Sequence, residues 1–154
     1  MAAGYFAVWA AIGMTVYPLG VGLAEAAMRS EALARAVPLA SALVVGAAGL
    51  LQLTAWKARQ LACCRMTPSQ RLAADAGTAW RHGIRLGLHC TSCCASPTAI
   101  LLALGVMDLY AMALVTAAIS AERLAPAGGR TARTIGVVAV GAGLVLAARA
   151  VGLR

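Results

Sequence analysis

All five cysteines of the chain lie between positions 63 and 94, around a strongly basic segment. Three of them, Cys90, Cys93 and Cys94, stand where this segment runs into a long apolar stretch. Their spacing of i, i+3 and i+4 predicts that the three thiols share one face of a helix. Thiolates are the ligands that soft metal ions prefer, and a bound metal lies about 2.3 Å from each sulfur. The spacing therefore predicts a soft-metal site, with Cu(I) favoured and Zn(II) or Hg(II) as alternatives.

Two further thiols and two imidazoles flank this trio. Cys63 and Cys64 end the preceding apolar helix at the same expected depth, so they could supply one or two more sulfur ligands. His82 and His89 lie just before Cys90 and could bind harder ions such as Zn(II) through nitrogen.

A second candidate position for binding a metal ion lies deeper in the apolar stretch, at Met107 and Asp108. Asp108 follows Cys94 by roughly 20 Å at helical rise, and a carboxylate at that depth normally faces the interior of a helical bundle. Because thioethers are good Cu(I) ligands, this pair could continue a metal path from the thiols. Alternatively, Met107 only packs, and Asp108 caps a helix break or lies near a headgroup.

Other interpretations of the thiols are inert packing and a disulfide or thiol-redox role. The Cys90-Thr-Ser-Cys93 spacing matches a two-cysteine redox motif, but the βαβ context that gives the motif meaning is absent. A cytoplasmic location also disfavours structural disulfides. Phosphate-binding glycine loops, paired carboxylates and a Ser/His/Asp set are missing from the sequence, so we expect a protein that is not an enzyme.

The elements that must position these residues are apolar and long. The chain is 62% hydrophobic and 12% charged, which is far from the balance of a soluble domain. Runs of this length cross a bilayer as helices, and residues 2–24 lack the basic start of a signal peptide. The expected membrane spans are residues 2–24, 36–56, 91–120 and 134–153.

Between the second and third spans, apolar residues recur at every fourth position of residues 69–88. This pattern predicts an amphipathic helix that lies in the headgroup plane or packs on the bundle. Gly105 and Asp108 mark a possible break in the third span. Because each half would be too short to cross, one long, tilted or kinked helix is expected there, with a tight hairpin as the alternative. The predicted fold is all-α: one integral membrane domain over residues 1–154, with about four transmembrane helices and an interfacial helix.

The net charge of +8 is concentrated in residues 57–88. Basic loops stay in the cytoplasm, so this segment is predicted to face inward from a bacterial inner membrane, and a nucleic-acid partner is not expected. With a single span at 91–120, the loop carrying Arg123, Arg130 and Arg133 would be external, which mildly violates the rule. Glu122 and Arg123 are expected to form an interfacial ion pair that ends the helix.

Two blocks of the sequence resemble one bacterial family. Residues 49–65, which contain Gln-Leu-Thr-Ala-Trp-Lys and end in Cys-Arg, look like its Gln-Leu-Thr-Pro-x-Lys block. The Cys-x-x-Cys-Cys of residues 90–94 and the Gly-Val-Met-Asp-Leu of residues 105–109 look like its second block, and Trp80-Arg81-x-Gly83 and Glu122-Arg123 also fit. The family is an uncharacterised group of predicted metal-binding integral membrane proteins, and the likeness covers about residues 4–124.

Carried over by position, the resemblance implies Cys64, Cys90, Cys93 and Cys94 as metal ligands. The chain departs from the family where Gln60 replaces a cysteine, Ala55 a proline and Asp108 an asparagine. Cys63 could compensate for Gln60. A weaker likeness runs to mercuric-ion transport proteins, which also place adjacent cysteines and then a proline at a helix start, as in Cys93-Cys94-x-x-Pro97.

Together these observations predict a soft-metal-binding membrane protein that handles uptake, transfer or supply of copper. The alternatives are a mercuric-type transporter, a non-catalytic accessory subunit with structural cysteines, and a thiol-redox membrane enzyme. The expected partners are the lipid bilayer, a metal ion, and a second copy of the chain or a membrane protein.

Overall fold

Helices make up the computed structural model, which describes residues 2–65, 75–105, 107–125 and 128–152. Within these ranges every regular element is helical, which confirms the all-α class. The helices are α1 (Ala2–Arg29), α2 (Glu31–Leu53), α3 (Ala55–Arg65), α4 (Ala76–Leu104), α5 (Leu109–Leu124) and α6 (Gly128–Ala150).

Four helices, α1, α2, α4 and α6, are long and apolar enough to cross a membrane. α3 and α5, with 11 and 16 residues, are shorter. Much of the apolar surface faces outward: Met14 on α1, Leu114 on α5 and Leu144 on α6 are each about two-thirds exposed or more. Such a surface is unfavourable in water, and it is what helices packed in lipid present.

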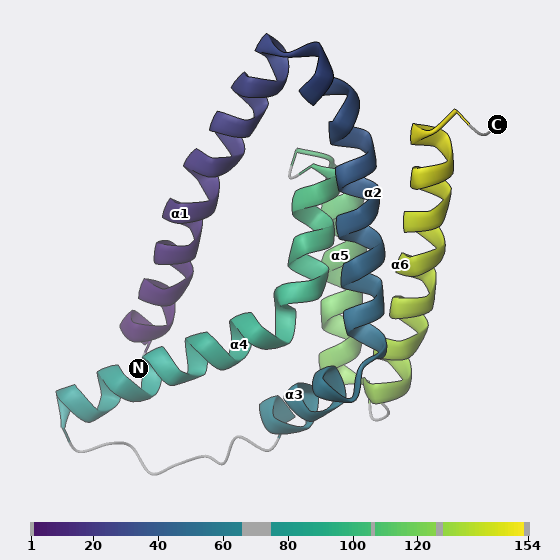
Figure 1. The fold of residues 1–154 in the computed structure, drawn as a ribbon. Coiled ribbons are helices and arrows are strands. Elements are labelled where there is room, and N and C mark those ends of the chain that lie inside the picture. The colour runs from purple at the N-terminus through teal and green to yellow at the C-terminus, as the bar shows by residue number, and fades with distance from the viewer. Residues whose placement is uncertain (1, 66–74, 106, 126–127, 153–154) are drawn as a thin grey trace.

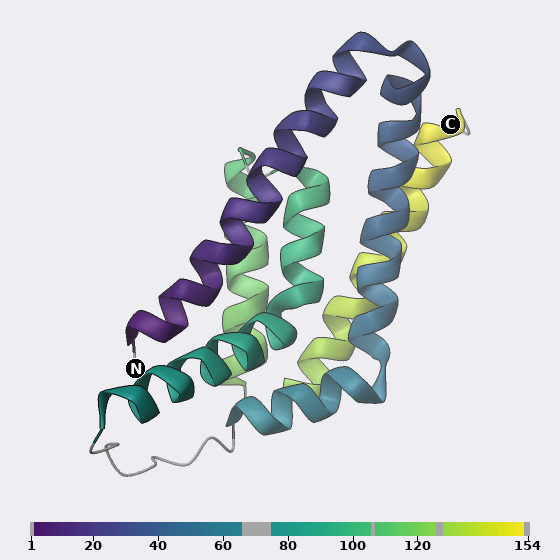
Figure 2. The same cartoon turned by 60° about the vertical axis from the view of Figure 1, so that its left-hand side comes forward.

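The helices form a bundle with a crossing layer at one end (Figure 1). α2, α5, α6 and the second half of α4 run along the bundle, while α3 and the first half of α4 lie across its lower end. α1 diverges from the bundle and meets the first half of α4 near the N-terminus (Figure 2). At that meeting point a side chain on Gly4 would lie 2.6 Å from the carbonyl oxygen of Trp80, so only glycine allows the approach.

Small residues also bring α2 and α6 together. A Cβ atom on Gly143 would lie 2.8 Å from the Cα of Gly46, and one on Gly49 would lie 2.7 Å from the amide nitrogen of Val140. Backbones that approach this closely gain dispersion contacts along their length, the usual source of helix association in lipid. The α2–α6 contact therefore depends on the absence of side chains at these positions.

The expected single helix over 91–120 was wrong. α4 ends at Leu104, Gly105 adopts a φ of 110°, and α5 begins at Leu109. Asp108 caps α5, because its Oδ1 accepts the amide hydrogens of Tyr110 at 2.8 Å and Ala111 at 3.1 Å. A positive φ favours glycine, and an aspartate cap satisfies amides that lack helical partners. α5 then runs back along the second half of α4 (Figures 1 and 2).

The expected second span, 36–56, also extends past a real break. α2 ends at Leu53 and Thr54 is extended, so Trp56 and Lys57 belong to α3. The Thr54 hydroxyl donates to the carbonyl oxygen of Leu51 at 2.6 Å and accepts the amide of Lys57 at 3.4 Å. One side chain therefore ends α2 and begins α3.

The expected interfacial helix at 69–88 is not a separate element. Residues 69–74 lie outside the described part of the chain, and residues 76–88 form the first half of α4, continuous with the cysteines. α4 bends between its two halves (Figure 1). Pro97 lies inside this helix, and a proline both removes a helical hydrogen bond and bends the helix one turn before it.

The break at 105–108 changes which charged segments lie together. α5 returns to the crossing layer, so its last turn and the start of α6 lie at the same end as α3 (Figure 2). The arginines expected on the opposite side, Arg123, Arg130 and Arg133, therefore join the basic segment. The N-terminus lies at this end and the C-terminus at the other (Figure 1).

We predict that Gly143→Val destabilises the protein by about 1–3 kcal/mol, because the added methyl groups must displace the α2 backbone. Gly141→Val is the matched control, since a Cβ at Gly141 meets nothing within 4 Å. Thermal unfolding in detergent measures both. Equal melting temperatures for the two variants would contradict the close α2–α6 contact.

Candidate metal site

Cys90 and Cys94 lie one turn apart on the bent part of α4 and share one partner on α5. The Arg123 guanidinium donates from Nη2 to the Cys90 sulfur at 2.9 Å and to the Cys94 sulfur at 3.3 Å. Because both sulfur atoms contact the same nitrogen, the distance between them cannot exceed the sum of these two distances. A metal bonded to both at about 2.3 Å needs them within roughly 4.6 Å. Small side-chain rotations could therefore let this pair hold one soft ion.

A third helix reaches the same pair. The hydroxyl of Tyr5, on α1, lies 3.2 Å from the Cys90 sulfur and is hydrogen-bonded to it. A thiolate only accepts hydrogen bonds, so once Cys90 is deprotonated the phenol must be the donor. The Cys90–Cys94 pair is thus contacted by α1 and α5 together.

Cys93 faces another way. It is 2% exposed and packs with Leu61 of α3 and Ala132 of α6. Consecutive helical residues are about 100° apart around the axis, so Cys93 and Cys94 point to different neighbours even though their thiols lie within hydrogen-bonding reach. The trio therefore shares one face only in part.

The other expected ligands are spread over the molecule. Cys63 is exposed on α3, and Cys64 belongs to the same helix with its side chain outside the described residues. Met107 is 91% exposed, next to the exposed Asp108 cap in the connection between α4 and α5. Among the described residues, no three His, Cys, Asp or Glu side chains are arranged to hold a metal ion. The ligand roles of these residues stay predictions.

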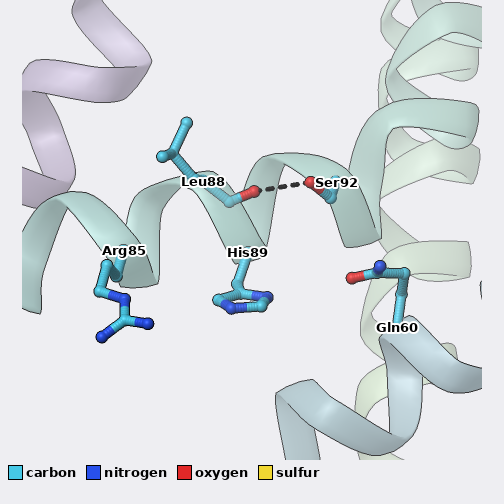
Figure 3. Close-up of a pocket in the computed structure, with 5 residues that line it drawn as sticks. All are labelled: Gln60, Arg85, Leu88, His89 and Ser92. Carbon is cyan, nitrogen blue, oxygen red and sulfur yellow. Dashed lines mark hydrogen bonds between the residues drawn. The ribbon is translucent and has the colours of Figure 1, made fainter.

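His89 lines a separate cavity of about 240 Å³ between α3 and α4 (Figure 3). Arg85 and His89 extend from α4 on the side of Gln60 on α3, and Leu88 and Ser92 complete the lining. Gln60 stands where the resembled family has a cysteine, and its buried Oε1 atom has no hydrogen-bond partner within the described chain. This cavity offers nitrogen and oxygen atoms rather than sulfur, so it would suit a harder ligand than the thiol pair.

A buried polar network adjoins the part of α4 that carries the cysteines. Its centre is Lys57, 1% exposed, whose ammonium group is 3.0 Å from the Glu122 carboxylate. The Gln52 amide nitrogen donates to the other carboxylate oxygen of Glu122, and the Ser96 hydroxyl donates to the Gln52 amide oxygen at 2.7 Å. Each of these four side chains is at least nine-tenths buried. The network joins α2, α3, α4 and α5.

Proline chemistry connects this network to the cysteine helix. Pro97 has no amide hydrogen, so the carbonyl oxygen of Cys93, four residues earlier, has no helical donor. The Lys57 ammonium supplies one, donating to this oxygen at 2.5 Å. The ammonium group therefore supplies the donor that the Cys93 carbonyl oxygen lacks, and this oxygen is an acceptor for the buried cation.

The expected ion pair between Glu122 and Arg123 was wrong. Glu122 bonds inward to Lys57, whereas Arg123 bonds to the thiols. Adjacent residues of a helix point in different directions, so both contacts form at once. The sequence alone did not predict this network. The available signals were polar residues within or at the ends of apolar stretches, such as Gln52 and Ser96, and Pro97 four residues after Cys93.

A family model described as "copper chaperone" (PpoB2) matches residues 1–146. This range includes the whole of α1 to α5 and most of α6, together with every residue of the thiol pair and the buried network. No curated protein and no solved structure matches the chain.

We predict that Lys57→Met destabilises the protein by about 3–5 kcal/mol, because it leaves the Glu122 carboxylate buried and unpaired. The Lys57→Met/Glu122→Gln double variant should recover much of this loss, since neither charge remains. Unfolding in detergent with increasing denaturant measures the series.

The exposed pair Glu31–Arg35, at 2.9 Å on α2, is the control. Arg35→Ala should change stability by no more than about 0.5 kcal/mol, because solvent screens such pairs. A Lys57→Met effect as small as this one would contradict a central role for the buried pair.

Proposed function

Because the chain belongs to the PpoB2 copper chaperone family, we propose that it carries Cu(I) as cargo on a membrane-embedded helical bundle. Cys90 and Cys94 are the proposed core ligands. The observation that carries this proposal is their shared contact with the exposed Arg123 guanidinium, which brings the sulfur atoms of the partly exposed Cys90 and the buried Cys94 close together.

The number and softness of the donors favour Cu(I). Thiolates select Cu(I), Zn(II) and related soft ions, but Zn(II) sites are almost always four-coordinate. The described pair offers two sulfur atoms, and a low coordination number suits Cu(I). Cys93 could join after a side-chain rotation, and Cys63 or Cys64 could add a sulfur from α3.

Copper transfer needs ligands that a partner can reach. Arg123, which contacts both sulfur atoms, is exposed, and Cys90 is partly exposed, whereas Cys94 is buried. An acceptor thiolate could therefore approach Cu(I) from the Arg123 side and replace one cysteine at a time. Met107 and Asp108 lie beyond the far end of α4, so we place them outside the core site. Supply of copper to an acceptor is favoured over conduction along the bundle.

The membrane setting is inferred from apolar length and charge. Four helices are long and apolar enough to cross a bilayer, and many of the large apolar side chains face outward. The basic end, formed by α3, the first half of α4, the end of α5 and the start of α6, is proposed to face the cytoplasm of a bacterial inner membrane. The thiol pair would then collect or deliver copper on the cytoplasmic side. No enzymatic step is proposed.

A mercuric-type transporter would use the same thiols for Hg(II), and an accessory subunit would use them only to support a complex. Metal content separates these possibilities. The detergent-purified chain, loaded with Cu(I) and desalted, should retain copper near its own concentration, and Cys90→Ser/Cys94→Ser should lose it. Elemental analysis, with competition by a Cu(I) chelator, gives the measurement.

Cys63→Ser is the comparison variant, since it removes an exposed thiol on a neighbouring helix. It should retain most of the copper. If the double serine variant keeps its copper while remaining folded, the pair is not the site. Equal copper loss in Cys63→Ser would instead extend the site to α3.

Sidedness gives a separate prediction. A variant whose only cysteine is Cys63 should react with a membrane-impermeant maleimide in inside-out vesicles and not in intact spheroplasts, because α3 is at the basic end. A cysteine-free variant carrying Arg29→Cys, at the opposite α1–α2 corner, should show the reverse pattern. Labelling of both from the same side would contradict the proposed crossing.

A further inference from the structure

A permanent positive charge lies beside the thiol pair. Arg123 contacts both sulfur atoms, while the neighbouring Glu122 carboxylate is bonded to Lys57 and Gln52 on the buried side. The α5 backbone thus separates an acidic group directed inward from a basic group directed at the thiols. A guanidinium stays protonated at any physiological pH, so its positive charge is a constant feature of the site.

Metal binding requires both cysteines as thiolates, which brings two negative charges to the pair. With Cu(I) and the guanidinium, these charges sum to zero. With a divalent ion such as Zn(II) or Hg(II), one positive charge is left over. An unbalanced charge is costly where the surroundings are apolar, and this pair on α4 is contacted by α1 and α5 in a largely apolar bundle.

We propose that Arg123 is the specificity-determining residue of the site, because its charge balances a monovalent ion held by Cys90 and Cys94 and disfavours a divalent one. This inference rests on the proposed function and adds the basis for choosing the metal. Arg123 is exposed, so its guanidinium has room to move aside as the ion enters while staying near the sulfurs. Tyr5 adds a hydrogen bond to Cys90 without adding charge.

The neighbouring Lys57 does not change this charge count. Its ammonium is bonded to the Glu122 carboxylate and to the Cys93 carbonyl oxygen, so the buried pair is neutral as a unit. The thiols of Cys90 and Cys94 therefore meet one uncompensated positive charge in the contacts described, that of Arg123.

The test compares Cu(I) and Zn(II) affinities of the full-length, detergent-purified chain, each by competition with a chelator of known affinity. Arg123→Gln should lower the ratio of Cu(I) to Zn(II) affinity by about 10- to 100-fold, a range that allows for solvent screening of an exposed charge. Arg123→Lys keeps the charge and should retain most of the ratio. Arg130→Gln, which removes an exposed arginine at the same end of the bundle, should leave it within about twofold.

An unchanged ratio in Arg123→Gln would overturn the proposal, as would an equal fall in Arg123→Lys. Arg123→Ala removes the same charge without adding a polar group, so it decides the question if the glutamine variant does not fold. The proposed function is tested by a different result. It is contradicted if Cys90→Ser/Cys94→Ser still binds Cu(I), whatever the ratio of Cu(I) to Zn(II) affinity in the arginine variants.

Discussion

The buried contact between Lys57 and Glu122 is the constraint on which the rest of the arrangement depends. Lys57 is almost completely enclosed and bonds to the Glu122 carboxylate and to the carbonyl oxygen that Pro97 leaves without a helical donor. Removing two charges from water is costly, and only complete pairing offsets that cost. The geometry of α3, α4 and α5 is therefore set by the need of one ammonium group to reach both acceptors.

That constraint explains how the thiols come to lie where they do. The bend in α4 separates a half that crosses the end of the bundle from a half that runs along it (Figure 1). Cys90 and Cys94 sit near this change of direction, where α1 can reach them through Tyr5 and α5 through Arg123. A straight α4 would not bring both of these helices to the same turn.

The sequence was sufficient for the helical class, for the long apolar helices α1, α2 and α6 to within several residues, and for the close spacing of Cys90 and Cys94. It was insufficient for the breaks at Thr54 and Gly105, because hydropathy does not distinguish one kinked span from two antiparallel helices. It was also insufficient for the surroundings of Lys57, since a lysine after an apolar run usually reaches toward headgroups. Its actual partners come from α4 and α5, and contacts between distant helices leave no local pattern.

The order Glu122-Arg123 has a mechanical consequence for α5. A rotation of α5 by one residue in one sense would direct Glu122 toward the sulfur atoms, and a rotation in the opposite sense would direct Arg123 into the enclosed core. Either change is electrostatically unfavourable. A slide by one residue would draw both side chains away from their partners together. The rotation of α5 about its own axis is therefore fixed. The buried Glu122–Lys57 pair and the contact of Arg123 with the thiols form together.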